Sequence, residues 1–382
     1  MAETATIHAC RLFSGDGAPP LIDHVVEITG DRIAAIRPAT ASDARDRRAT
    51  QADVVAPGFI DLQINGAGDR QFNHDPTPET LRIMAEAAAK GGTAHILPTF
   101  ITAPGRDYLL AIAAVRAAIA AGVPGIIGLH LEGPFLSPHR PGIHPPAAIR
   151  PLTPEDIALI CAAARDIPIL LTLAPEALPH GALTALLTAG VTVFAGHTEA
   201  SADDIALVEA QGLRGATHLF NAMSQMGGRA PGVAGAVMAS DRLFAGIIAD
   251  GHHVDWRSLT VACRAMPGRL FLITDAMRTL AGTIPRFTLD GREITLQGSR
   301  LTDAQGTLAG AHIDMVSCIR NVVDQCGVPL ARALDMASGI PARAMGLSPE
   351  LGRIAVGNPV SLVCLSDDFS VLAVRGAVRS KE

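Results

Sequence analysis

Two short apolar runs, each with a histidine at or near its end and one helical segment between them, constrain this chain more than any other stretch. The run VTVFAGH ends at His197, and the run GATHLFN contains His218. The segment SADDIALVEAQ between them is helical in pattern, so the order is strand, helix, strand. Because parallel strands finish at the same edge of a sheet, we expect both imidazoles to face one site.

A third strand candidate, GIIGLHLEG, places Glu132 at the same kind of strand end. Two histidines and one carboxylate around an open position form a ligand set found in catalytic divalent-metal sites. A single histidine at a strand end is more often an ordinary hydrogen-bonded polar residue. Three strand-end residues of compatible chemistry make a metal site the better interpretation.

From Val54 onward, short apolar runs alternate with helical segments. Eight runs qualify as strands: VVAPGFIDLQIN, TAHILPTF, GIIGLHLEG, IPILLTLAP, VTVFAGH, GATHLFN, LFAGIIADG and LFLITDA. Eight strands alternating with helices are typical of an α/β fold of the TIM (β/α)8 barrel type, whose chemistry lies at the carboxyl ends of the strands. His253 and Asp275 also fall at such ends. The turn-rich stretch after Asp275 is expected to be an inserted β-hairpin.

Both ends of the chain have strand patterns. Residues 3–37 contain short alternating runs separated by Gly-rich turns, and a strand pattern returns from Gly352. We therefore expect a small β-sandwich-like domain formed by residues 1–53 and 352–382, beside a catalytic barrel of residues 54–351. A chain of 382 residues is long enough for both.

Composition limits the partners of such a protein. A formal net charge of −6, with one Trp and one Tyr, argues against a nucleic-acid surface, which needs basic patches and stacking rings. The six cysteines are scattered and form no CxxC pair, as expected of a reduced cytoplasmic protein. We see no signal-peptide core and no apolar run of membrane-spanning length, so no membrane partner is expected.

Seven motifs together resemble the N-acetylglucosamine-6-phosphate deacetylase family of the amidohydrolase superfamily. They are PGFIDLQING at 57–66, HLEGPF at 130–135, GHTEAS at 196–201, THLFNAM at 217–223, ADGHHVD at 249–255, TDAM at 274–277 and TLAGA at 307–311. The motif PGFID alone would indicate only some amidohydrolase. The resemblance implies a barrel with a β domain built from both termini, hydrolysis of the acetamide of an amino-sugar phosphate, and a homodimer.

Site residues follow from the resemblance position by position. Glu132, His197 and His218 match the metal ligands, in agreement with the strand-end pattern, and Asp275 matches the general base and acid that serves a metal-activated water. The residues implied for substrate are His144 at the acetyl carbonyl, Arg229 and His253 at the phosphate, Asn221 and Ala222 through backbone amides, and Gly310 and Ala311 through backbone contact with the sugar. In this family the arginine can come from the partner subunit. Asp275 could instead cap a helix, and His144 and Arg229 could be plain surface residues.

One departure from the wider superfamily concerns the number of metals. Many amidohydrolases carry two histidines after PGFID that hold a second metal, but here those positions are Gln63 and Asn65. Neutral amides are poor ligands for a transition metal. We therefore expect one divalent metal per chain, with zinc as the first expectation and iron, cobalt or manganese as alternatives. His312, directly after TLAGA, is expected near substrate without an assigned role.

Three functions remain open from the sequence. The favoured one converts N-acetylglucosamine 6-phosphate and water to glucosamine 6-phosphate and acetate. A second is an amidohydrolase for another N-acetyl amino-sugar phosphate, such as galactosamine, or for another N-acyl or cyclic amide. A third is a non-catalytic scaffold, but a scaffold has no reason to keep Glu132, His197, His218 and Asp275 all at strand ends.

Overall fold

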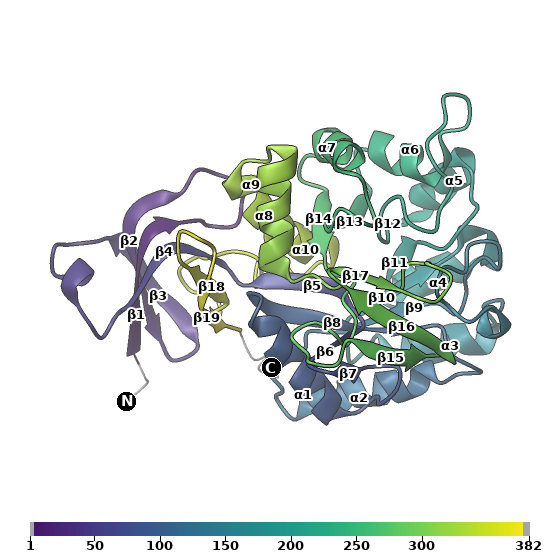
Figure 1. The fold of residues 1–382 in the computed structure, drawn as a ribbon, viewed down its shortest axis with the longest axis horizontal. Helices are drawn as coiled ribbons and strands as arrows, with labels where there is room; N and C mark the ends of the chain where they lie inside the picture. The colour runs from purple at the N-terminus through teal and green to yellow at the C-terminus, as the bar shows by residue number, and fades with distance from the viewer. Residues whose placement is uncertain (1–3, 377–382) are drawn as a thin grey trace.

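A computed structural model describes residues 4–376 of the chain. Figure 1 shows a sheet made from both chain ends lying beside a barrel. The sheet has six strands in the order β19-β18-β4-β1-β2-β3. Their bounds are Thr4–Leu12 (β1), Leu21–Thr29 (β2), Arg32–Pro38 (β3), Thr50–Pro57 (β4), Leu362–Leu365 (β18) and Val371–Arg375 (β19).

Alternating side chains attach this terminal sheet to the barrel. On β4, Val54 and Ala56 belong to the core shared with the barrel, while Val55 between them belongs to the sheet's own core. On β18, Val363 belongs to the core shared with the barrel, and Cys364 belongs to the sheet's own core. Because successive side chains of a strand point to opposite faces, these two strands serve both cores at once.

The run VVAPGFIDLQIN, expected as one strand, is two strands. Its first part lies in β4 of the terminal sheet, and its second part is β5, Phe59–Ile64, of the barrel. Gly58 separates them, and a Cβ atom at this position would lie 2.6 Å from both Ala94 Cβ and Ser361 Oγ. The predicted fold class, a barrel with a β domain from both termini, is confirmed. The exact domain boundaries stay a prediction, and β4 spans the one expected after residue 53.

Eight strands form the barrel sheet in the order β14-β13-β12-β11-β10-β9-β8-β5. Besides β5 they are Thr93–Ile101 (β8), Leu129–Glu132 (β9), Ile169–Leu173 (β10), Thr192–Ala195 (β11), Gly215–Ala216 (β12), Phe244–Ile248 (β13) and Leu270–Ile273 (β14). Each predicted run contains one of them, and the recorded neighbours pair in parallel. The seam between β14 and β5 is closed by backbone hydrogen bonds from Asp275 N to Gln63 O, 2.9 Å, and from Asn65 N to Ala276 O, 2.8 Å.

Helices follow the barrel strands, and several of them begin beside a side chain that accepts a hydrogen bond from their first turn. They are Pro78–Ala89 (α1), Tyr108–Ala120 (α2), Pro154–Ala163 (α3), Ala182–Thr188 (α4), Ala202–Gln211 (α5), Gly232–Ala239 (α6), Trp256–Ala265 (α7), Met315–Cys326 (α8), Leu330–Ala337 (α9) and Gly339–Ala344 (α10). Thr153 with Asp156 and Ser201 with Asp204 form capping boxes at the starts of α3 and α5. The segment SADDIALVEAQ, expected to be helical between the two histidine strands, contains α5.

A three-stranded antiparallel sheet takes the place of the expected inserted hairpin. Its strands are Arg286–Leu289 (β15), Arg292–Gln297 (β16) and Arg300–Thr302 (β17). This insertion has a small core of its own that includes Phe287, Leu289, Ile294 and Leu301 and extends to Met277 beside the barrel mouth. A two-stranded hairpin, Gly66–Ala67 (β6) and Arg70–Gln71 (β7), follows β5.

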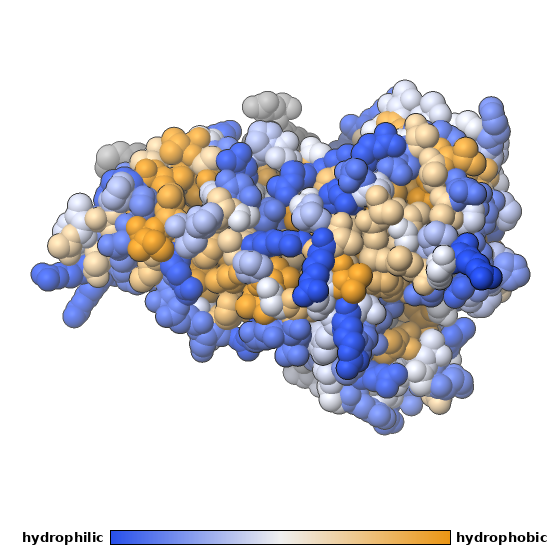
Figure 2. Space-filling view, turned by 90° about the horizontal axis from the view of Figure 1, so that it is seen from above, coloured by the Kyte–Doolittle hydropathy of each residue, from blue (hydrophilic) through white to orange (hydrophobic). Residues whose placement is uncertain are grey.

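Hydrophilic side chains are spread over the face of the molecule in Figure 2, with hydrophobic areas between them.

Within residues 4–376, no helix combines the length and the apolar character that crossing a membrane requires. The six cysteines are not paired in disulfides within the described residues.

A buried carboxylate ties α2, α3 and the loop between β9 and α3 together. The side chain of Asp156 is 0% exposed and accepts hydrogen bonds from Tyr108 Oη at 2.8 Å, Arg106 Nε at 3.0 Å and both terminal nitrogens of Arg150 at 2.6 and 2.8 Å. Thr153 donates to it as well. Burial opposes ionisation, but the bonds from Arg150 and its other partners outweigh it and hold the pKa of Asp156 below its ordinary value of 3.8.

The substitution Asp156→Ala is expected to lower the free energy of unfolding by at least about 1–3 kcal/mol, because it leaves the buried hydroxyl of Tyr108 and the partly buried Arg106 and Arg150 without their acceptor. A depressed pKa stabilises the folded state above pH 3.8 and loses that stabilisation as the pH falls, so the variant should lose part of the protein's acid sensitivity. Urea denaturation at pH 7 and at about pH 2.5, well below the ordinary pKa of an aspartate, measures both effects.

Glu155→Ala is the matched control, since Glu155 pairs with Arg106 but its side chain is 67% exposed. The control should lose less than about 1 kcal/mol. Equal losses for the two variants would contradict the account.

Candidate active site

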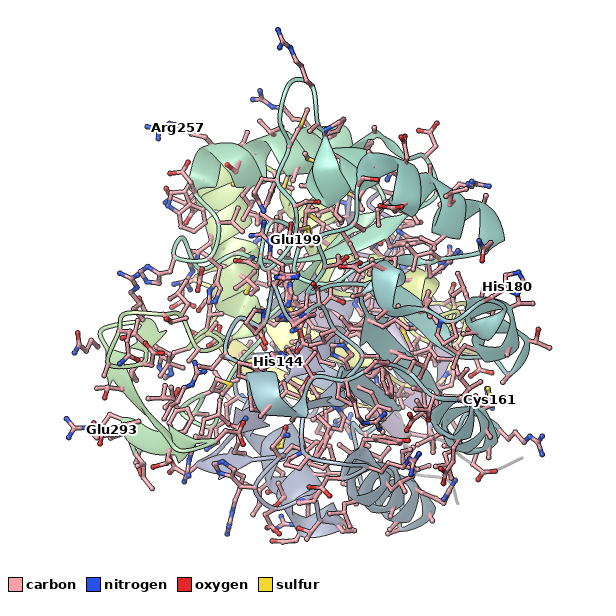
Figure 3. The ribbon with its side chains drawn as sticks, turned by 90° about the vertical axis from the view of Figure 1, so that its right-hand side faces the viewer. His144, Cys161, His180, Glu199, Arg257 and Glu293 are labelled. Atoms are coloured by element: carbon pink, nitrogen blue, oxygen red, sulfur yellow. The ribbon has the colours of Figure 1, made fainter. Side chains whose placement is uncertain are left out.

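The predicted chemical residues gather at the carboxyl ends of the barrel strands. Glu132 is the last residue of β9, and His197, His218 and Asp275 each lie two residues beyond the end of β11, β12 and β14. In Figure 3, which faces this side of the molecule, His144 and Glu199 lie near the centre while Arg257, His180 and Glu293 lie toward the periphery. The barrel therefore brings together residues that are up to 143 positions apart along the chain, from Glu132 to Asp275.

Three of these residues have a left-handed backbone. The φ angles are 49° at His197, 33° at His218 and 49° at Asp275. Such conformations destabilise a residue other than glycine by about 1–3 kcal/mol and persist where the surroundings fix them. Other residues of the described chain, such as Asp23 and Asp290, also have a positive φ, but at His197, His218 and Asp275 it coincides with the residues expected to carry the chemistry.

Glu132, His197 and His218 crowd three electron-rich atoms together. Oε1 of Glu132 lies 2.8 Å from Nε2 of His218 and 3.2 Å from Nε2 of His197, and the two Nε2 atoms are 3.1 Å apart. Ligands bound tetrahedrally at about 2.0–2.1 Å from zinc lie about 3.3 Å from one another. A divalent cation would relieve the mutual repulsion of these atoms, so the donor set fits one metal ion. The residues are buried, which keeps competing water away.

Glu132, His144 and His197 also form a group whose possible ligand atoms lie within 4.8 Å of one another. Nε2 of His144 is 3.9 Å from Oε2 of Glu132, which is longer than any contact among Glu132, His197 and His218. The distances therefore favour His218 over His144 as the third ligand. Burial, together with the nearby His197, lowers the pKa of His144 to about 3, so its imidazole is neutral at pH 7.

The loop after β9 holds His197 in place. Nδ1 of His197 lies 2.8 Å from the carbonyl oxygen of Arg140, and N of Ser137 donates to the carbonyl oxygen of His197 at 2.8 Å. A proton on Nδ1 leaves the Nε2 lone pair free for a metal. Gly142, with φ of 54°, lies so close that a Cβ atom there would be 3.2 Å from Cε1 of His197. The ring of His144 lies 4.3 Å from that of His197.

Gln63 and Asn65 hold carboxylates where the wider superfamily has metal-binding histidines. Nδ2 of Asn65 donates to Oδ1 of Asp275 at 2.7 Å, and Nε2 of Gln63 donates to the same oxygen at 3.1 Å. Nε2 of Gln63 is also 3.3 Å from both carboxylate oxygens of Glu132. These amide groups act as hydrogen-bond donors, which supports the prediction of one metal.

The surroundings of Asp275 make its carboxyl group a weaker acid than an ordinary aspartate. Burial, and then the charge of Glu132, raises the pKa of Asp275 to about 6. A carboxyl group with a pKa near neutrality can both accept and return a proton. The side chain is therefore suited to the general base and acid role expected from the sequence.

A cavity of about 380 Å³ opens over these groups. Its lining includes the predicted residues Glu132, His144, His197, His218, Asn221, Ala222, His253, Asp275 and Gly310. Ala311 is buried behind the lining, where its N donates to the carbonyl oxygen of Asp275 at 2.9 Å. Arg229 is exposed on the loop before α6 and does not line this chain's cavity.

Arg300 is a cavity residue that sequence reasoning missed. It begins β17 of the inserted sheet and lines the cavity together with Gly306, Thr307 and Leu308. The sequence predicts only an inserted hairpin in this part of the chain. Its arginines are the one sequence feature that could have indicated a residue for binding an anionic group in the cavity.

His253 is fixed by Asp250, whose Oδ2 lies 2.7 Å from Nδ1 of His253.

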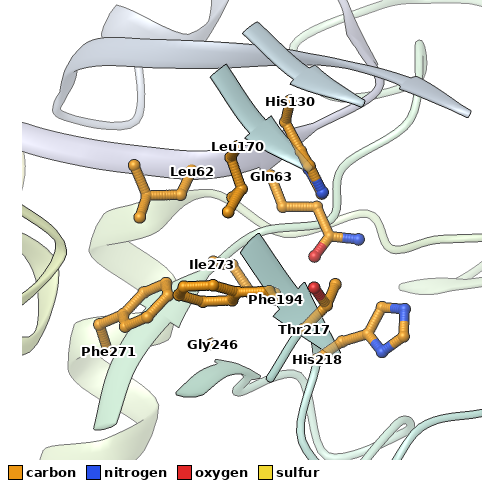
Figure 4. A pocket seen from close by; sticks show the side chains of 10 residues that line it. All are labelled: Leu62, Gln63, His130, Leu170, Phe194, Thr217, His218, Gly246, Phe271 and Ile273. Carbon is orange, nitrogen blue, oxygen red and sulfur yellow. The ribbon is translucent and has the colours of Figure 1, made fainter. Parts of the chain in front are cut away.

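The remaining histidines lie outside the cavity. His130 is buried in the barrel interior between the hydroxyls of Thr99 at 3.1 Å and Thr172 at 2.8 Å, and burial lowers its pKa to about 4. It lines a void of only about 10 Å³ on the barrel axis, shown in Figure 4 with Gln63, Thr217 and His218. His312 lines a neighbouring cavity with Asp250 and has Nδ1 3.0 Å from Thr279 Oγ1, so the structure does not place it at the expected substrate position.

Comparison with known proteins agrees with this fold and shows the family. Residues 54–380 match the amidohydrolase family. The match covers most of the barrel and the strands that return to the terminal sheet. The chain belongs to the amidohydrolase family, and it is a hydrolase.

Relatives that match most of the chain include deacetylases of phosphorylated amino sugars. The chain is 40% identical over 335 residues to the N-acetylgalactosamine-6-phosphate deacetylase of a Shewanella species, covering 87% of this chain and 84% of the relative. It is 35% identical to the N-acetylglucosamine-6-phosphate deacetylase of Haemophilus influenzae, covering 92% and 93%. The crystal structure of the N-acetylglucosamine-6-phosphate deacetylase from Pasteurella multocida matches with a TM-score of 0.91 at 34% identity, covering 97% and 98%. The resemblance found in the sequence motifs is confirmed.

The geometry of the site leads to a prediction of how many zinc ions the chain binds and which residue most affects the affinity. Purified protein loaded with zinc and dialysed should retain about one equivalent per chain, because Gln63 and Asn65 supply no ligands for a second ion. Glu132→Gln should weaken zinc binding by more than the roughly 10–100-fold that loss of an outer hydrogen bond costs. Metal analysis and competition with a chromogenic chelator measure both.

His312→Asn is the control, since His312 is outside the metal group, and it should bind zinc as the unaltered chain does. Two equivalents in the unaltered chain, or unchanged affinity in Glu132→Gln, would contradict the assignment.

Proposed function

We propose that this protein hydrolyses the acetamide of N-acetylglucosamine 6-phosphate to glucosamine 6-phosphate and acetate. The observation that carries the proposal is the convergence of Glu132, His197, His218 and Asp275 on one cavity of about 380 Å³. This volume is within the range of about 300–1,000 Å³ typical of small-molecule sites. The names of relatives that match most of the chain support the choice of substrate.

Glu132, His197 and His218 would hold one divalent metal, with zinc first and iron, cobalt or manganese as alternatives. Such an ion can lower the pKa of a water from 15.7 to about 7 and so supply a nucleophile at neutral pH. Asp275 accepts the proton of the attacking water and returns it to the amine nitrogen as the carbon–nitrogen bond breaks. Asn65 and Gln63 keep the carboxylate of Asp275 in place through the hydrogen bonds at 2.7 and 3.1 Å.

The rest of the cavity would bind the amino-sugar phosphate. Neutral His144 donates a hydrogen bond to the acetyl oxygen as negative charge develops there. Its Nδ1 lies 2.8 Å from Thr102 Oγ1, and a hydroxyl proton donated by Thr102 to Nδ1 would orient the ring and leave the single ring proton on Nε2 for the substrate. His253 and Arg300 are basic residues of the lining that lie in reach of a phosphate, and Asn221, Ala222 and Gly310 would add backbone contacts. Because Arg229 lies outside this cavity, its phosphate role would require the cavity of a partner subunit in a homodimer.

The N-acetylgalactosamine 6-phosphate reaction is the second candidate. It is favoured by the Shewanella relative, which is 40% identical to this chain. The two sugars differ only in the configuration of one hydroxyl, so the same metal, proton and phosphate groups would serve both. Cytoplasmic localisation and the homodimer remain predictions from the sequence.

Acetate release from the two sugar phosphates, with unphosphorylated N-acetylglucosamine alongside, tests the proposal. The zinc-loaded chain should turn over N-acetylglucosamine 6-phosphate and should act on the unphosphorylated sugar with a much lower kcat/KM, because phosphate contacts to basic groups are lost. A higher kcat/KM for the galactosamine compound would replace the first candidate by the second. No acetate from either phosphate would overturn both.

The pH dependence of the reaction tests the role of Asp275. A base must be deprotonated, so kcat/KM should rise with pH through the pKa of Asp275. The metal-free value is about 6, and a nearby cation stabilises the carboxylate, so the midpoint should lie at or below about pH 6. Asp275→Asn should lower kcat by at least about 10²–10⁴-fold while zinc binding persists. A midpoint above pH 7 or an active Asn variant would contradict the role.

A further inference from the structure

One buried carboxylate beside the site has no part in the chemistry above. Asp61 on β5 is 0% exposed, and in the part of the chain that the structure describes no arginine, lysine or histidine forms an ion pair with it. Burial raises the pKa of Asp61 to about 7. A buried carboxyl without a cation partner destabilises a fold. The hydrogen bonds of Asp61 therefore indicate which part of the structure this residue stabilises.

Asp61 bonds the two strands that meet at the seam of the barrel. Its Oδ1 accepts from N of Gln63 on β5 and from N of Thr274 after β14, both at 3.2 Å. Its Oδ2 accepts the hydroxyl proton of Thr274. The oxygen of that hydroxyl in turn accepts from N of Ala276 at 3.2 Å. The chain of bonds from Asp61 through Thr274 to Ala276 thus fixes the residues on both sides of Asp275.

The backbone of Asp275 needs such support. Its φ of 49° lies in the left-handed region, which is unfavourable for a residue other than glycine. Its N donates to the carbonyl oxygen of Gln63 at 2.9 Å, and its own carbonyl oxygen accepts from N of Ala311 at 2.9 Å. Rotation of this backbone to an ordinary conformation would carry the carboxylate away from Gln63 and Asn65.

We infer that Asp61, acting through the hydroxyl of Thr274, is a positioning residue that holds Asp275 in the left-handed backbone conformation from which its carboxylate faces the substrate cavity. The catalytic consequence rests on the proposed function, whereas the effect on the Asp275 backbone does not. If Asp61 only closed the seam between β14 and β5, its loss would lower stability but leave kcat per metal-loaded chain unchanged.

The test compares Asp61→Asn, Thr274→Val and Thr274→Ser. Valine has nearly the shape of threonine without the hydroxyl, and serine restores the hydroxyl. For acetate release we expect kcat to fall by about 10–100-fold in the Asn and Val variants, the range expected for misplacement of a catalytic group. KM should stay within about threefold, and zinc should remain at about one equivalent. Serine should rescue most of kcat, and the Asp61→Asn/Thr274→Val pair should lose no more than its worse single member.

A crystal structure of Thr274→Val supplies a readout that does not depend on activity. We expect the φ of Asp275 to leave the left-handed region or its contacts with Gln63 and Asn65 to lengthen beyond hydrogen-bond distance. An unchanged Asp275, or an unchanged kcat per zinc-loaded chain in the Val variant, would overturn the inference. If Asp61→Asn does not fold, the Val and Ser pair decides. If the unaltered chain releases no acetate, the proposed function fails and the crystal structure alone decides the positioning.

Discussion

The crowding of three electron-rich atoms at one end of the barrel is the constraint on which the site depends. Glu132 Oε1 and the Nε2 atoms of His197 and His218 lie 2.8–3.2 Å apart, and parallel strands that finish at one edge leave them little freedom to separate. Without a positive charge between them, this arrangement is unfavourable. A divalent cation would turn the same crowding into coordination, so we expect the fold to hold these three proposed ligands close together.

Around this centre, the chain uses hydrogen bonds to fix charges that would otherwise repel. The amide of Gln63 donates hydrogen bonds to both Glu132 and Asp275, and it thereby reduces the repulsion between these two carboxylates. The amides of Gln63 and Asn65, at positions where many amidohydrolases carry metal-binding histidines, therefore orient Asp275, the proposed general base. Across the same seam, Asp61 on β5 and Thr274 after β14 hold the backbone of Asp275. Hydrogen bonds from β5 and from the residues after β14 thus together stabilise the left-handed backbone of Asp275.

Much of this arrangement could be predicted from sequence, because it depends on periodicity and strand order. Glu132, His197, His218 and Asp275 each follow an apolar run, and the alternation of runs and helices identified the barrel that unites them. Other features depend on contacts between distant residues that no local pattern contains. The split of VVAPGFIDLQIN at Gly58 reflects close packing against Ala94 and Ser361. The place of Arg300 in the cavity, and of Arg229 and His312 outside it, depends on how loops and the inserted sheet fold over the barrel.

The most direct test of the account is a crystal structure of the zinc-loaded protein with anomalous diffraction collected at the zinc absorption edge. The account predicts one anomalous peak per chain, bonded to Glu132, His197 and His218 at about 2.0–2.2 Å, with His144 outside bonding distance. A peak bonded to His144 in place of His218, or a second peak beside Gln63 and Asn65, would contradict it.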